Sequence, residues 1–131
     1  MPAAERSDIA RYAAADAVFE RRQVDATGVE VIPTPGHSPG STSFLVPGVD
    51  GDYLFTGDAV YRGADGRWAA GFLRGTSDPV ALAASLDVLA ALRPALMASS
   101  AFAGGAGAHA MTPAAWAAAV AQARVTLPAS A

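Results

Sequence analysis

The sequence predicts a single α/β domain. Short apolar runs bounded by glycine and proline are typical of strands, and they alternate with longer segments that carry apolar residues at helical spacing. The chain is 131 residues long, which is a common size for one domain. We find neither an internal repeat nor a linker in it. Residues 1–131 are therefore expected to fold as one unit.

The first half of the chain is expected to contain one helix followed by strands. A helix is predicted from about residue 8 to residue 22, with Ser7 as its N-cap and apolar side chains along one side. Three strands are predicted after it, at residues 29–32, 44–46 and 53–55. The last two are separated by the turn 48–51, which begins and ends with glycine, so they are expected to form a β-hairpin.

The second half is expected to contain two helices separated by a short strand. Asp78 followed by Pro79 predicts a helix start, and this helix should end before Pro94. Thr112 followed by Pro113 repeats the signal and predicts a final helix that carries Trp116 and Val120 inward. Between them we expect a strand at residues 95–98 and a Gly/Ala loop at 103–108. Residues 62–75 predict only a long loop or an irregular strand.

Composition excludes several classes of function. The net charge is −3, the pI is about 5.1 and the chain has no lysine, so it lacks the basic surface that binds nucleic acid. The absence of cysteine excludes disulfides and thiolate metal sites. Charged residues interrupt the N-terminal segment and no apolar run approaches the length of a membrane span. We expect a cytoplasmic protein that contacts neither nucleic acid nor membrane.

Two strand-to-loop junctions carry possible metal ligands. Residues 34–42 read TPGHSPGST and contain His37, and residues 54–58 read LFTGD and end in Asp58. This pair of motifs resembles the metallo-β-lactamase superfamily. The resemblance implies that His37 and Asp58 are ligands for one or two zinc or iron ions, with Asp58 in the catalytic centre and usually bridging two metals. Taken alone, His37 could be an ordinary surface-loop histidine and Asp58 a carboxylate that caps a turn.

The resemblance covers the C-terminal half of the family's αββα fold. It implies a mixed or antiparallel sheet with helices on one face, an α+β-like half of a sandwich. The family's HxHxDH motif is absent from this sequence, and Ala101 stands where the family's last histidine ligand is expected. His109, eight residues further on, is the candidate replacement. A surface histidine before a helix is the alternative interpretation.

Three functions remain open from the sequence. The chain could be a hydrolase domain with an incomplete metal site, inactive alone or completed by a partner half, acting on an ester, thioester, lactone or lactam. It could instead be a degenerate, non-catalytic domain that acts in binding or self-association. A third possibility is a homodimer that pools His37 and Asp58 from two chains. The missing half also predicts an exposed apolar sheet face, and hence a homodimer or a partner half-domain.

Overall fold

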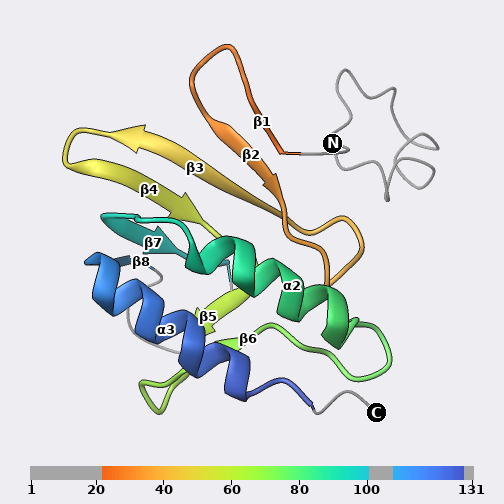
Figure 1. The fold of residues 1–131 in the computed structure, drawn as a ribbon. Coiled ribbons are helices and arrows are strands. Elements are labelled where there is room, and N and C mark those ends of the chain that lie inside the picture. The colour runs from red at the N-terminus through yellow and green to blue at the C-terminus, as the bar shows by residue number, and fades with distance from the viewer. Residues whose placement is uncertain (1–21, 101–107, 129–131) are drawn as a thin grey trace.

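A mixed sheet with two helices on one face forms the body of the molecule, and a small two-stranded ribbon lies beside it (Figure 1). The computed structural model describes residues 22–100 and 108–128. The fold class predicted from the sequence is confirmed. The predicted helix from residue 8 to residue 22 lies, apart from its last residue, outside the described part of the chain, and so does Ala101.

The main sheet has six strands in the order β1-β2-β3-β4-β7-β8. Neighbouring strands are antiparallel except β4 and β7, which are parallel. Because parallel strands end at the same edge of a sheet, the residues after β4 and after β7 lie close together. The strands are β1 (Gln23–Val24), β2 (Glu30–Pro33), β3 (Thr42–Gly48), β4 (Gly51–Phe55), β7 (Leu96–Ala98) and β8 (Ala108–Ala110).

The predicted hairpin is confirmed as β3 and β4. The two strands pair from Phe44 with Phe55 to Gly48 with Gly51, so two residues form the loop. The structure extends β3 past Pro47, where the sequence suggested an end. β2 begins at Glu30, which pairs with Leu45, so Pro47 lies beyond the reach of that neighbour. A proline lacks a hydrogen-bond donor and is tolerated at such an unpaired edge.

The two helices predicted in the second half of the chain are confirmed with their caps. α2 (Pro79–Ala90) begins after Asp78, whose carboxylate accepts hydrogen bonds from the amides of Val80 and Ala81. α3 (Pro113–Val125) begins after Thr112, whose hydroxyl accepts from Ala115. These side chains satisfy amides that the first helical turn leaves free.

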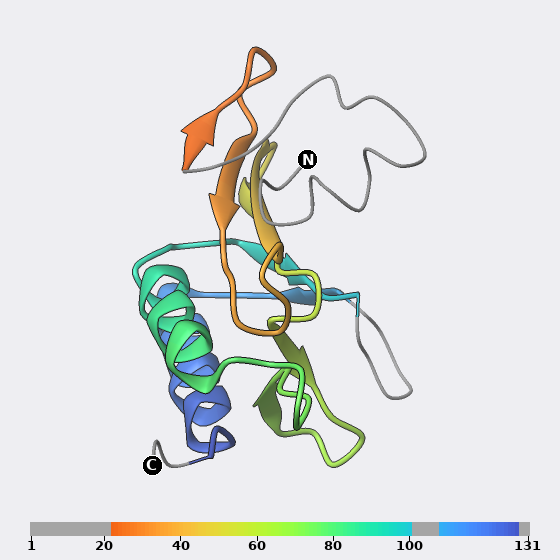
Figure 2. The same cartoon turned by 90° about the vertical axis from the view of Figure 1, so that its right-hand side faces the viewer.

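The hydrophobic core lies between the two helices and one face of the sheet. Side chains alternate between the faces of a strand, and Ile32, Leu54 and Met97 all point to the helices. They pack with Leu82, Leu86 and Leu89 of α2 and with Trp116, Ala119, Val120 and Ala123 of α3. Both helices lie on the same side of the sheet (Figure 2). Among the described residues, no helix is long and apolar enough to cross a membrane.

Three short strands depart from the sequence expectation. β5 (Val60–Arg62) and β6 (Trp68–Ala70) form an antiparallel ribbon where the sequence predicted only a loop or an irregular strand. β8 begins at Ala108, the last residue of the predicted Gly/Ala loop. The ribbon and β8 depend on tertiary partners. Two amides of β6 donate to side chains of α3 and of its C-cap, and β8 pairs with β7. Strands of three residues carry too little periodicity to reveal this.

Candidate metal centre

The loop that carries His37 is fixed by a hydrogen bond within its own backbone and by hydrogen bonds to two other segments. Its backbone is closed by the Thr34 amide, which donates to Ser41. The Ser85 hydroxyl of α2 donates to the Pro35 carbonyl at 2.7 Å, and the Ser77 hydroxyl donates to the His37 carbonyl at 3.0 Å. The loop is therefore held against α2 and the segment before it, which orients the imidazole.

Asp58 is placed by the turn that follows β4. The Gly57 carbonyl accepts hydrogen bonds from the Ser99 hydroxyl at 2.8 Å and from the Ser100 amide at 2.9 Å. The buried Thr56 hydroxyl donates to the Val60 carbonyl at 3.0 Å across the turn. The parallel neighbour β7 thus supplies the segment that holds the Asp58 turn in place.

These two supports bring the predicted ligands together. His37 Nε2 lies 3.4 Å from Asp58 Oδ2. On the other side of the ring, His37 Nδ1 lies 2.8 Å from the carbonyl oxygen of Gly71. The His37 side chain is 22% exposed and the Asp58 side chain 43% exposed, so solvent reaches the pair. The structure therefore places the two side chains next to each other at a solvent-accessible edge of the sheet.

The hydrogen-bond pattern leaves Nε2 available as a ligand. A carbonyl oxygen can only accept, so Nδ1 carries the hydrogen. In the neutral ring Nε2 then has a free lone pair beside the carboxylate. Two acceptor atoms 3.4 Å apart favour a cation between them. Charge-assisted hydrogen bonds are about 2.7–2.9 Å long, whereas two ligands of one tetrahedral zinc ion lie about 3.3–3.4 Å apart at bond lengths of about 2.0–2.1 Å.

A cleft of about 300 Å³ opens over the pair. Its lining is mostly polar and comes from the His37 loop and the Asp58 turn: His37, Ser38, Ser41, Thr42, Thr56, Gly57 and Asp58. This volume is at the lower end of the range for small-molecule sites. The arrangement suits a cation with room for a small polar group next to it.

The structure does not bring His109 to this pair. His109 lies in β8, where it is paired with Met97, and its ring meets the ring of Trp68 edge to face at a centroid distance of 5.1 Å. Its side chain therefore points to the helix side of the sheet, with Met97. Within residues 22–100 and 108–128, no group of three histidine, cysteine, aspartate or glutamate side chains is placed to hold a metal ion.

Sequence reasoning missed two residues that orient His37. Gly71 accepts the Nδ1 hydrogen bond, and Ser77 binds the His37 carbonyl while also accepting from the Leu73 amide. Both lie in the segment between β6 and α2, for which the sequence predicted no defined structure. Nothing local distinguishes Gly71 from Gly63, Gly66 or Gly75, because its contacts are with residues distant in the sequence.

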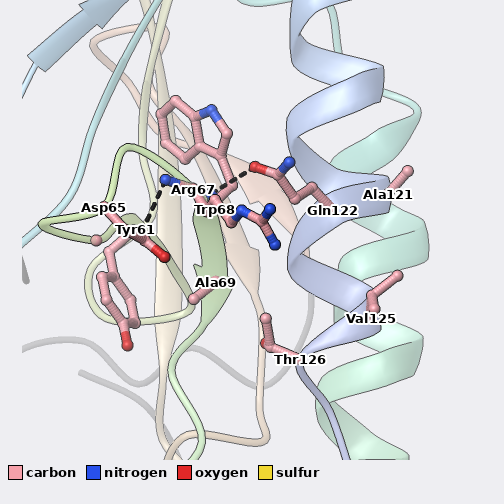
Figure 3. Close-up of a pocket in the computed structure, with 10 residues that line it drawn as sticks. Tyr61, Asp65, Arg67, Trp68, Ala69, Ala121, Gln122, Val125 and Thr126 are labelled. Atoms are coloured by element: carbon pink, nitrogen blue, oxygen red, sulfur yellow. Dashed lines mark hydrogen bonds between the residues drawn. The ribbon is translucent and has the colours of Figure 1, made fainter.

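A second and larger cavity lies between the β5–β6 ribbon and α3 (Figure 3). It has a volume of about 760 Å³ and shares no lining residue with the cleft over His37. On its wall the Trp68 amide donates to Gln122 Oε1 at 2.7 Å, and nearby the Ala70 amide donates to the Thr126 hydroxyl at 3.0 Å. These bonds tie β6 to α3 along an otherwise unpaired edge.

Comparisons with solved structures agree with this architecture. TTHA1623 in a di-iron-bound form is 29% identical, with a TM-score of 0.56 over 82% of this chain and 48% of that one. ST1585 from Sulfolobus tokodaii, an archaeal metallo-beta-lactamase superfamily protein, is 26% identical, with a TM-score of 0.52 over 82% of this chain and 40% of that one. ETHE1 from Myxococcus xanthus shares the fold at 22% identity, with a TM-score of 0.58 over 86% and 48%.

The chain thus spans about half the length, or less, of the solved structures it matches. No curated protein matches it. A sequence model of the Metallo-beta-lactamase superfamily matches residues 9–100, which is more than half of the chain and includes both His37 and Asp58. The chain therefore belongs to the metallo-β-lactamase superfamily.

Proposed function

We propose that this chain is a metal-binding half of a metal-dependent hydrolase, inactive alone and completed by a partner half. His37 and Asp58 supply two of the metal ligands, and Asp58 belongs to the catalytic centre. The 3.4 Å separation of His37 Nε2 and Asp58 Oδ2 carries this proposal, because it suits two ligands of one ion better than a direct hydrogen bond. The expected substrate is an ester, thioester, lactone or lactam.

The metal in this proposal is zinc or iron. Imidazole nitrogen and carboxylate oxygen are suitable ligands for both. The di-iron form of TTHA1623 supports iron, and the family resemblance supports zinc. When bound, such an ion supplies a nucleophile from water at neutral pH and polarises the reacting carbonyl group.

The residues of this chain would orient the metal ligands and line the cleft that receives the substrate. The loop around His37 presents Nε2 in one tautomer, and Asp58 supplies a negative charge that the ion neutralises. Ser41 and Thr42 line the same cleft, where a polar substrate group can contact them. The cleft volume of about 300 Å³ is suited to a small acyl group.

A catalytic zinc site takes about three protein ligands. The described residues provide His37 and Asp58 but no third ligand close to them, and His109 lies against Trp68. We therefore expect the isolated chain to bind metal weakly. It should hydrolyse generic ester or lactam substrates no faster than the free metal ion does.

The sheet face opposite the helices supports a partner. Phe44 and Phe55 are directly opposite each other on β3 and β4 and are 37% and 40% exposed. The sheet register places Val46, Tyr53 and Leu96 on the same face. We call these five residues the open face. We propose that a second sheet layer covers the open face, and that a second copy supplies this layer in the purified chain.

Titration of the purified chain with Zn²⁺ and with Fe²⁺ tests the metal site. Elemental analysis after dialysis, combined with calorimetry, should show weak binding that His37→Ala and Asp58→Asn each reduce by more than about 100-fold, beyond the 10–100-fold loss typical of changes outside the ligand shell. His109→Gln is the matched control and should leave the affinity unchanged.

Each result decides between the functions that the sequence left open. Binding that requires neither His37 nor Asp58 overturns the metal site and favours a non-catalytic binding domain. Tight binding retained through dialysis, with turnover that His37→Ala abolishes, overturns the incompleteness of the isolated chain. One ion per two chains, still dependent on both residues, favours the homodimer that pools two pairs.

A further inference from the structure

The backbone of Gly71 lies against both residues of the proposed metal pair. Its carbonyl oxygen is 2.8 Å from His37 Nδ1. A Cβ atom at position 71 would lie 1.6 Å from the carbonyl oxygen of Asp58 and 3.2 Å from His37 Nδ1. Real Cβ atoms do not approach other atoms within 3.0 Å, so no other residue fits here without displacing Asp58.

We infer that Gly71 is a positioning residue for the His37–Asp58 pair. Its carbonyl selects the His37 tautomer whose Nε2 lone pair is free, and its missing side chain lets the Asp58 backbone lie against the same peptide. This inference rests on the proposed metal site but is about geometry that exists without a metal. Metal-binding histidines are held in this way by an acceptor on the second ring nitrogen.

Hydrogen bonds of its own amide and of the preceding residues fix the position of Gly71. Its amide donates to the Ala59 carbonyl at 2.9 Å, next to Asp58. The preceding residue, Ala70, is buried, and its amide donates to the Thr126 hydroxyl at 3.0 Å. Two residues before Ala70, the Trp68 amide donates to Gln122 (Figure 3). The β5–β6 ribbon is thus anchored on α3 and presents the Gly71 carbonyl to His37 in a fixed position.

The tautomer of His37 in the metal-free protein is the first test. The chain has only two histidines, so ¹⁵N-resolved imidazole spectra are assigned by comparison with His109→Gln. Recorded at about pH 8.5, where an ordinary imidazole is neutral, they should show a hydrogen on Nδ1 of His37. A hydrogen on Nε2 instead would overturn the inference, whatever the metal affinity is.

The second test compares Gly71→Ala with Gly63→Ala on the same ribbon. A Cβ at position 63 meets the Asp65 side chain at 3.1 Å, and an exposed side chain can move aside. Gly71→Ala should lose the single His37 tautomer and weaken Zn²⁺ binding about 10–100-fold, while Gly63→Ala changes neither. Wild-type tautomer and affinity in folded Gly71→Ala would overturn the inference.

A milder pair of variants serves if Gly71→Ala does not fold. Thr126→Val removes the hydroxyl that accepts from the Ala70 amide, and Thr126→Ser keeps it. Thr126→Val should give a mixture of His37 tautomers and a several-fold loss of Zn²⁺ affinity, which Thr126→Ser restores. If Thr126→Val keeps one tautomer, the ribbon does not position His37. If the wild type has the expected tautomer but binds no metal, the proposed function fails while the positioning by Gly71 stands.

Discussion

Close backbone contacts at single residues determine where the two ligands lie. At Gly36 the loop touches α2, since a Cβ there would lie 2.4 Å from the Cα of Leu82. The Gly36 carbonyl also accepts from the amide of Asp78, the cap of α2, at 2.8 Å. The residue before His37 is therefore packed directly on a helix. This contact sets how far the imidazole reaches toward Asp58.

Gly36→Ala should destabilise the protein more than Gly75→Ala does. Both glycines have a positive φ, of 140° and 85°, but a Cβ at position 75 meets nothing within 4 Å. Backbone strain alone costs about 1–2 kcal/mol, and overpacking against Leu82 should add about 1–3 kcal/mol to the loss in unfolding free energy. Urea unfolding measures both variants. Equal losses would show that the contact with α2 relaxes without cost.

The same residues show why the site was only partly predictable from the sequence. His37 and Asp58 stand in short motifs at strand ends, so their chemistry is visible in local sequence. Gly71 and Ser77 both form hydrogen bonds with His37, which precedes them by 34 and 40 positions in the sequence. A sequence pattern does not report such contacts. His109 has a suitable side chain for a ligand, but pairing of β8 with β7 directs it to Trp68.

At the scale of elements, the helices and strands that could be predicted are those whose ends are marked in the local sequence. The hairpin of β3 and β4 has glycine at both ends of its turn, and the helices α2 and α3 each have a cap followed by proline. β1, β5, β6 and β8 have two or three residues each and depend on neighbours for pairing. β1, the ribbon and β8 were missed for that reason, although the ribbon carries the support for His37.

The edge hairpin of β1 and β2 offers a pH-dependent test. Arg22 forms two hydrogen bonds with Glu30 of β2, at 2.6 and 3.1 Å. The Arg22 side-chain hydrogen bond holds the pKa of Glu30 below its ordinary value of 4.5. A carboxylate with a lowered pKa in the folded state stabilises it above the ordinary pKa. That stability is lost as the pH falls through the lower, folded value.

Glu30→Gln should therefore lower the unfolding free energy by at most about 1 kcal/mol at pH 7, as expected of a surface ion pair. The difference from the wild type should shrink as the pH falls below 4.5 and should also shrink in about 1 M salt. Urea unfolding between pH 7 and about pH 2.5 measures it. A difference that persists at the lowest pH would mean that Glu30 acts through packing and not through its charge.

At the scale of the whole molecule, the two sheet faces differ within residues 22–100 and 108–128: one packs on the helices, and the other has Phe44 and Phe55 partly exposed beside the buried Val31. The helices and the core occupy one side, as Figure 2 shows. The other carries the open face, centred on Phe44 and Phe55. Asp58 of the 3.4 Å pair follows β4, the strand that also carries Phe55, whereas His37 lies in the loop after β2. A layer that covers the open face would therefore lie next to the strand that leads to Asp58.

Association of the purified chain should depend on the open face. Burying the exposed parts of Phe44 and Phe55 should stabilise a dimer by about 1.5–2.5 kcal/mol per side chain at about 25 cal/mol per Å². Replacing both by serine should thus weaken self-association at least about tenfold. Val49→Ser is the matched control, because Val49 is 98% exposed in the β3–β4 turn and lies off this face.

Light scattering at tens of micromolar, with binding of a hydrophobic dye, distinguishes a self-associating chain from a monomeric one. A wild-type chain that stays monomeric and binds no dye would show that the open face needs no second sheet layer, and the proposed partner half would lose its support.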